Sequence, residues 1–137
     1  IEGILALWRA CGGRGSELGV GEQDRALAAV SHLPHLLSYA LVGELARRDD
    51  VERLFDLAAG GFRDFTRIAG SHPEMWRDIC LANRDALLAE LDAYGDELAR
   101  LRAMIVRGDA QGLFDAFAVA RQARNAWVAK DDAGRQA

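Results

Sequence analysis

The stretch AAVSHLPHLLSYALV, residues 28–42, decides the fold, because apolar side chains occupy nearly every position around the helix that it predicts. A helix that is apolar on all sides is a buried one, either inside a bundle or inside an oligomer. Pro34 has no amide hydrogen, so the carbonyl of Val30 is expected to lose its usual partner and the helix to kink there. We therefore predict a buried, kinked helix over 22–47.

The remaining composition agrees with a single all-α domain in the cytoplasm. The chain has 137 residues, of which 50% are hydrophobic, and only two are proline. Its two cysteines lie far apart and form no CxxC pair, which is typical of a reduced cytosolic protein. A net charge of −4 without a basic cluster argues against nucleic-acid binding. No apolar run reaches the length expected of a membrane span.

A second long helix is predicted from Glu74 to Arg107, longer than a domain of this size needs. Gly108 is expected to end it, and Asp109 to cap a last helix that runs to about Val128. This helix and the all-round apolar one together predict a dimer of interleaved helices, with a monomeric bundle as the alternative. On the predicted helix from Glu74 to Arg107, apolar residues at alternating steps of four and three form a seam: Leu87, Leu91, Tyr94, Leu98, Leu101 and Ile105.

Two tempting patterns are predicted to carry no site. Gly13, Gly15 and Gly19 approach a dinucleotide fingerprint, but a helical segment precedes them and no βαβ unit follows, so a loop is expected. His32 and His35 are three residues apart on one helix, which is close enough to share a metal ion. No third ligand stands at a defined spacing from them, so no metal site is predicted.

A polar pair marks the predicted kink. Ser31 and His35 are four residues apart and therefore share one helix face. Such a pair inside an apolar helix fits the wall of a ligand pocket. A core histidine bonded to a backbone carbonyl fits the same pattern, and the residues of this helix alone leave both interpretations open.

The segment 61–70, GFRDFTRIAG, predicts a short helix with charged residues in apolar company. Arg63 and Arg67 are four residues apart, and Asp64 is three residues before Arg67. An arginine in such surroundings needs an anion, and its planar fork matches a carboxylate. Asp64 can supply that carboxylate, or a substrate can. Trp76, one turn into the next predicted helix, is placed to cover such a site.

The residues resemble a known family at this point. AAVSHLPHLLSYALV (28–42) and GGFRDFTRIAGSHPEMWRDICLANRDALL (60–88), in this order and spacing, resemble the C-terminal domain of the prephenate/arogenate dehydrogenases. The resemblance implies a helical dimerisation and substrate-capping domain over 21–137, similar to the C-terminal domain of 6-phosphogluconate dehydrogenase. Residues 1–20 would then be the end of a preceding nucleotide-binding domain.

The resemblance implies an oxidoreductase of tyrosine biosynthesis. Such enzymes oxidatively decarboxylate prephenate to 4-hydroxyphenylpyruvate, or arogenate to tyrosine, and pass a hydride to NAD or NADP. The catalytic histidine and the cofactor site belong to the preceding domain, so this chain is expected to hold neither and to be inactive alone. The implied partners are a second copy, the substrate, and tyrosine as an inhibitor. The alternatives are a stand-alone module that binds tyrosine or prephenate, and a purely structural helical dimer.

The resemblance also implies a role for each candidate residue. Arg67 would hold a substrate carboxylate, whereas Ser31 and His35 would line the end of the pocket that receives the ring. Asp64 and Trp76 would belong to the surrounding ionic and gating network.

The residues beside the site, and one departure from the family, complete this expectation. The resemblance leaves Arg63 and His32 as structural neighbours of the site. The chain has Gln23 and Asp24 where the family often has His-Asp before its first long helix. This difference is expected to alter the entrance of the pocket without changing a catalytic position.

Overall fold

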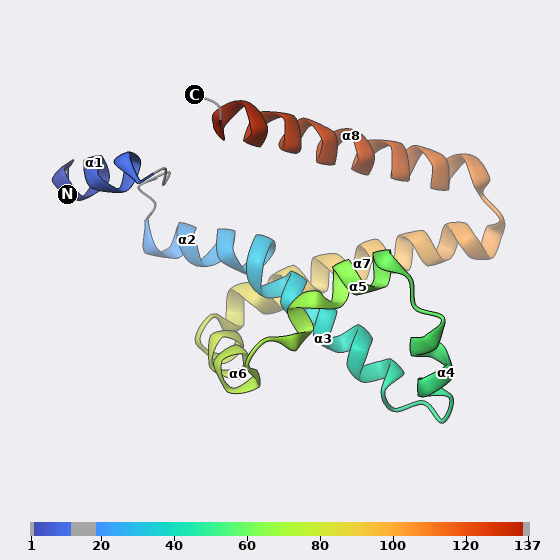
Figure 1. The fold of residues 1–137 in the computed structure, drawn as a ribbon. Coiled ribbons are helices and arrows are strands. Elements are labelled where there is room, and N and C mark those ends of the chain that lie inside the picture. Colours follow the sequence, from blue (N-terminus) through green and yellow to red (C-terminus); the bar gives the residue numbers. More distant parts are fainter. Residues whose placement is uncertain (1, 12–18, 136–137) are drawn as a thin grey trace. The chain divides into compact units, whose positions relative to one another are not determined.

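The computed structural model describes residues 2–11 and 19–135, and every regular element in these ranges is helical (Figure 1). The predicted all-α class is therefore confirmed. The chain divides into two compact units, a central unit of Leu18–Tyr94 and a terminal unit made of Ile1–Glu17 and Gly95–Ala137. The elements are α1 (Glu2–Ala10), α2 (Val20–Leu27), the π-helix η1 (Ala28–His32), α3 (Leu33–Leu45), α4 (Val51–Asp56), α5 (Gly60–Thr66), the 3-10 helix η2 (Arg67–Gly70), α6 (Pro73–Ala82), α7 (Arg84–Arg107) and α8 (Ala110–Arg135).

The first long helix contains a widened turn just before its proline. Helix α2, η1 and α3 follow one another without a break from Val20 to Leu45, close to the predicted range of 22–47. At the end of η1 the amide of Leu33 donates to the carbonyl of Ala28, five residues back. Pro34 cannot donate a hydrogen bond, so the regular pattern breaks beside it, and the ribbon changes direction through this segment (Figure 1).

Helix α3 is the centre of the central unit, where η1, α5 and η2 pack against it. The Tyr39 hydroxyl donates a 2.6 Å hydrogen bond to the carbonyl of Ser71. This bond ties α3 to the segment between η2 and α6. The buried side chains of this unit are few and come from η1, α3, α6 and α7: Ala28, Leu33, Ser38, Trp76 and Leu87.

The prediction that this helix is buried on all sides is wrong for a single copy of the chain. The side chain of Val30 is 75% exposed, and Leu27 and Leu41 also reach solvent. The elements of one chain cover only part of the helix surface, because the packing of η1, α5 and η2 leaves other faces open. An all-round apolar helix with open faces agrees with the oligomeric alternative stated above.

The continuous helix Val20–Leu45 has 26 residues and, by length and composition alone, is long and apolar enough to cross a membrane. This finding differs from the expectation that no apolar run reaches the length of a membrane span. The core helix of a soluble protein meets the same criterion.

The predicted helix from Glu74 to Arg107 is two helices in the structure. Asn83 separates α6 from α7 with non-helical dihedrals, φ −110° and ψ 36°. Its side-chain amide bonds to groups on α2 and η1, and asparagine commonly exchanges helical geometry for such bonds. The expectation of one unbroken helix was therefore wrong at this residue.

The terminal unit contains the hairpin between the two longest helices. Gly108 has φ +66° and ends α7, and the amide of Gly112 donates a 2.8 Å bond to the Asp109 carboxylate, which confirms the predicted cap. Helix α8 then runs back beside the second part of α7 and ends at Arg135, beyond the predicted Val128 (Figure 1). No side chain that the structure describes in this unit is buried.

The N-terminal expectations are only partly covered. The loop predicted around Gly13 and Gly15 falls in residues 12–18, outside the described residues, as does part of the supposed remnant of a preceding domain at 1–20. Val20, the last residue of the supposed remnant, begins α2.

Candidate functional site

Trp76 is the centre of the candidate site. It stands in the first turn of α6, and its side chain is only 8% exposed. The ring of His35 stacks on it, with centroids 3.5 Å apart and planes 17° apart. The ring of His32 meets it edge-on, with centroids 6.2 Å apart. Two histidines therefore flank one indole, beside the widened turn η1; π-helical turns of this kind are frequent at functional sites.

The ring of His35 is fixed by the backbone of η1. Its Nδ1 lies 2.9 Å from the backbone carbonyl oxygen of Ser31, four residues earlier. This contact is the bond to a backbone carbonyl that a core histidine would make. The His35 ring is nevertheless only half-buried. The bond uses Nδ1 alone, which leaves Nε2 for another partner.

Asn83 is a member of this site that the sequence analysis missed. Its Nδ2 donates a 2.7 Å hydrogen bond to the carbonyl of Asp24 and lies 3.2 Å from Nδ1 of His32. A polar asparagine within a predicted continuous helix was the available signal, because asparagine favours helix ends and turns.

The predicted cationic part of the site lies on α5 and η2. Arg63, Asp64 and Arg67 are all exposed. None of these three side chains has a hydrogen-bond or ion-pair partner within the described part of the chain, and in particular Asp64 pairs with neither arginine. The alternative in which Asp64 serves as the anion of these arginines is therefore not what the structure contains. The guanidinium of Arg67 is free to meet an external carboxylate.

Three of the five predicted site residues meet through direct contacts or through the backbone of η1. Trp76 stacks on His35, and His35 contacts the carbonyl of Ser31. Arg67 and Asp64 do not touch this trio, although η2 and α5, on which they stand, both pack against α3. All five lie in the central unit. The fold thus places all five predicted site residues in the central unit, around α3.

An apolar groove of about 380 Å³ runs beside Trp76, between α3 and α6. Burial raises the pKa of the Cys80 thiol above its ordinary value, so this thiol stays protonated and is a poor nucleophile. Apart from Cys80, the groove is lined by Leu36, Tyr39, Pro73, Trp76, Arg77 and Leu81.

Two kinds of chemistry have no residues to support them in the described ranges. No three histidine, cysteine, aspartate or glutamate side chains gather there to hold a metal ion. The described residues also contain no strand, and so they offer no βαβ unit with a phosphate-binding glycine loop.

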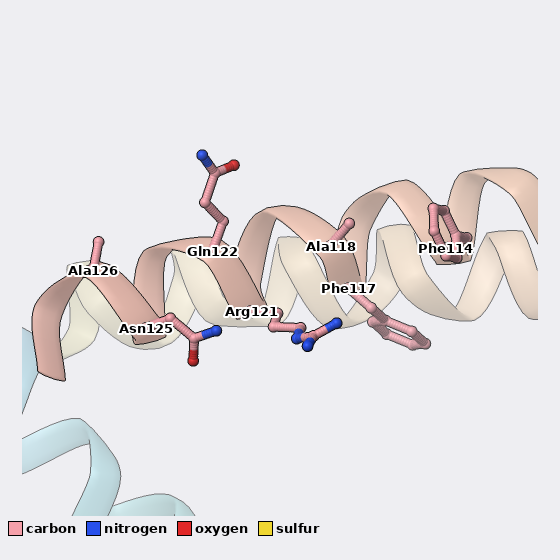
Figure 2. A pocket seen from close by; sticks show the side chains of 7 residues that line it. All are labelled: Phe114, Phe117, Ala118, Arg121, Gln122, Asn125 and Ala126. Carbon is pink, nitrogen blue, oxygen red and sulfur yellow. The ribbon is translucent and has the colours of Figure 1, made fainter. Parts of the chain in front are cut away.

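The terminal unit carries a different surface, on α8. An open hollow of about 650 Å³ is lined by residues of this one helix. Figure 2 shows Phe114 and Phe117 pointing away from the helix axis, with Arg121 and Asn125 further along it. Phe114 is 66% exposed and Phe117 is 59% exposed. Aromatic side chains left open in this way typically mark a protein interface.

Comparison with known proteins decides the family. A family model described as "Prephenate dehydrogenase, dimerization domain" matches residues 21–119. The chain belongs to this family. It is 38% identical over 123 residues to the cyclohexadienyl dehydrogenase of Zymomonas mobilis, covering 88% of the chain and 42% of that protein. It is 35% identical to the prephenate dehydrogenase of Bacillus subtilis, covering 91% of the chain and 34% of that protein.

Solved structures agree with this assignment. The arogenate dehydrogenase of Synechocystis superposes with a TM-score of 0.81 at 26% identity, over 92% of this chain and 46% of that one. The prephenate dehydrogenase of Aquifex aeolicus, in complex with hydroxyphenyl propionate and NAD+, also gives 0.81, at 34% identity, over 90% of this chain and 43% of that one. The chain spans less than half the length of each of these relatives.

Proposed function

We propose that this chain is the C-terminal, helical part of a cytoplasmic NAD- or NADP-dependent prephenate or arogenate dehydrogenase of tyrosine biosynthesis. The family supports this proposal, as do relatives that are dehydrogenases of prephenate, arogenate or cyclohexadienyl substrates. The observation that carries it is the cluster of Trp76 and two histidines beside a π-helical turn, all within the matched residues 21–119. Residues 21–137 form the helical domain in this proposal, and 1–20 close a preceding nucleotide-binding domain.

Each candidate residue has a proposed task in substrate binding. The unpaired guanidinium of Arg67 holds a substrate carboxylate, since a planar fork and a carboxylate form two parallel charge-assisted hydrogen bonds. Ser31 and His35 line the part of the pocket that receives the ring. Trp76, stacked on His35, covers the substrate. Asp64 belongs to the charged surroundings of the pocket, without pairing with Arg67 in this structure.

The proposed assembly is a homodimer. Helix α8 exposes large apolar side chains along 26 residues, and the all-round apolar helix of the central unit is open on several faces. A second copy of the chain would cover both surfaces, in agreement with the family's description as a dimerization domain.

The cofactor belongs to the proposed preceding domain. NAD is present in the Aquifex aeolicus structure, but the described residues of this chain, helices and turns only, do not fit a dinucleotide. No catalytic step is assigned to this chain for the same reason: it binds and covers substrate. Tyrosine, which shares the ring and a carboxylate with the substrates, is proposed to compete for the same pocket.

Reduction of NAD+ and NADP+ tests the proposal. Prephenate and arogenate are supplied in turn to the 137-residue chain and to the longer gene product that contains it. The longer protein is expected to reduce one of the two cofactors and the 137-residue chain neither. Turnover by the 137-residue chain would refute the division of labour between two domains. A longer protein that is folded and inactive with both substrates would refute the dehydrogenase assignment itself.

A further inference from the structure

Asn83 occupies a junction of the central unit where three segments meet. It separates α6 from α7, and its side chain reaches back to α2 and η1. The same nitrogen, Nδ2, lies 2.7 Å from the Asp24 carbonyl and 3.2 Å from Nδ1 of His32. One amide group therefore joins the end of α6 to the ring that touches Trp76.

The chemistry of these partners determines which atom donates each hydrogen bond. A backbone carbonyl oxygen can only accept, so the Asn83 atom facing the Asp24 carbonyl must be the amide nitrogen with its two hydrogens. Its second hydrogen is available to Nδ1 of His32. Nδ1 has to accept that hydrogen and must therefore be unprotonated. A neutral His32 ring then carries its proton on Nε2.

The other histidine at Trp76 is held in the opposite form. Nδ1 of His35 lies 2.9 Å from the carbonyl oxygen of Ser31, another group that only accepts. Nδ1 of His35 must therefore carry the hydrogen, and the Nε2 of a neutral His35 is left with a lone pair. The two rings on one indole are thus complementary, because one Nε2 can donate and the other can accept.

We propose that Asn83 is a positioning residue that fixes the tautomer of His32, so that His32 and His35 present opposite hydrogen-bonding groups beside Trp76. A neutral ligand group that meets His35 at Nε2 must then bring a donor, and one that meets His32 must bring an acceptor. The meaning of this for substrate recognition rests on the proposed function. The tautomers of His32 and His35 do not depend on the proposed function.

Nitrogen-15 spectroscopy of the imidazoles tests this proposal on the 137-residue chain. The chain has only three histidines, and His72→Gln removes the exposed third one from the spectrum. The spectrum is recorded at about pH 8.5, where an imidazole of ordinary pKa, about 6.5, is neutral. We expect His32 to be protonated at Nε2 and His35 at Nδ1. If both rings carry the proton on the same nitrogen, or if His32 is a mixture of tautomers, this spectrum overturns the proposal before any variant of Asn83 is made.

The Asn83→Asp variant removes both hydrogens that the amide donates, the one to the Asp24 carbonyl and the one to His32. A carboxylate keeps the shape of the side chain but can only accept, so we expect His32 to take up a proton at Nδ1 while His35 keeps its tautomer. Asn125→Asp makes the same change of charge on α8 and should leave both rings as they were. A His32 spectrum unchanged by Asn83→Asp in a folded variant contradicts the positioning role. Dehydrogenase activity is measured separately: its absence would overturn the proposed function and leave the tautomers as measured.

Discussion

The central and terminal units of this chain differ in how far they bury their apolar side chains. The central unit encloses a small core of its own, and the site cluster around Trp76 is part of it. The terminal unit contains no buried side chain among its described residues, although α8 alone is 26 residues long. Its large apolar side chains are open to solvent: Ile105, Val106, Phe114, Phe117, Val119 and Trp127.

This contrast indicates where each unit obtains its stability. Isolated helices are only marginally stable in water, and most helical stability in proteins comes from packing an apolar face. Complete burial of one phenylalanine contributes about 1.5–3 kcal/mol. The central unit obtains part of this contribution within one chain. In the proposed homodimer a second copy supplies this contribution mainly to the terminal unit and to a smaller extent to the central unit, so the stability of the terminal unit should depend more strongly on protein concentration.

The largest expected effect is on the core of the central unit. Replacing Trp76 by alanine should lower the free energy of unfolding by about 3–5 kcal/mol, because it opens a cavity where the buried indole packs on His35. Urea denaturation followed by circular dichroism measures this loss. It should be the same at low and at high protein concentration, since the contact lies within one chain.

Trp127 provides the matched control for this experiment. It stands on α8, 63% exposed, and its ring lies 4.8 Å from the guanidinium carbon of Arg124. Trp127→Ala should cost at most about 1 kcal/mol within one chain, the value of an exposed cation–π contact. Equal losses for the two tryptophans at low protein concentration would remove the distinction between the units.

The next effect is on assembly. Phe117→Asp places a charge in the open hollow of α8 and should weaken the proposed dimer by about 2 kcal/mol per copy. Both copies carry the change in a two-fold interface, so the total is about 4 kcal/mol, or roughly a thousandfold in dissociation constant. Sedimentation velocity over a range of concentrations measures this shift.

Asp132→Ala removes an exposed charge from the same helix and serves as the control. Its sedimentation should match that of the unchanged chain. A Phe117→Asp variant that remains dimeric at the concentrations where the unchanged chain does would show that the hollow of α8 is not covered by a second copy.

The third effect separates function from folding. In the longer dehydrogenase that is proposed to contain this chain, Arg67→Ala should raise KM roughly 30- to 900-fold. This corresponds to a loss of about 2–4 kcal/mol of binding free energy, since one charge-assisted pair with the substrate is lost. Arg67 is exposed and has no partner among the described residues, so the free energy of unfolding should change little. Steady-state kinetics and urea denaturation are measured on the same preparation.

Arg63 is the matched control, because it stands one turn earlier, is equally exposed and is also unpaired. Arg63→Ala should leave KM within about twofold of the unchanged enzyme. If the two alanine variants raise KM to the same degree, the effect is one of general charge and the specific assignment of Arg67 is lost.

The sequence predicted those parts of the molecule that depend on local pattern. The helix around Pro34, the end of α7 at Gly108 and the Asp109 cap all follow from the chemistry of single residues and their neighbours. The contact of His35 with the backbone carbonyl of Ser31 follows from their spacing of four residues. These features need no knowledge of what packs on them.

The parts that were missed depend on contacts between distant residues. The break at Asn83 comes from bonds to Asp24 and His32, more than fifty residues earlier in the chain, which no local pattern reveals. The stack of Trp76 on His35 likewise joins two helices. The all-round apolar pattern of the first long helix likewise could not say whether the same chain or another one covers its open faces.

The smallest expected effect concerns the turn of the terminal unit. Gly108→Ala should cost about 1 kcal/mol, because φ +66° is strained for a residue with a Cβ, although nothing stands within 4 Å to obstruct the added carbon. Gly95→Ala, within α7 and equally unobstructed, should instead stabilise the helix by about 1 kcal/mol. The two changes are chemically identical and differ only in backbone conformation. Urea denaturation at a concentration that keeps the chain dimeric should therefore give opposite signs, and the same sign in both would mean that the turn at Gly108 relaxes when the partner is bound.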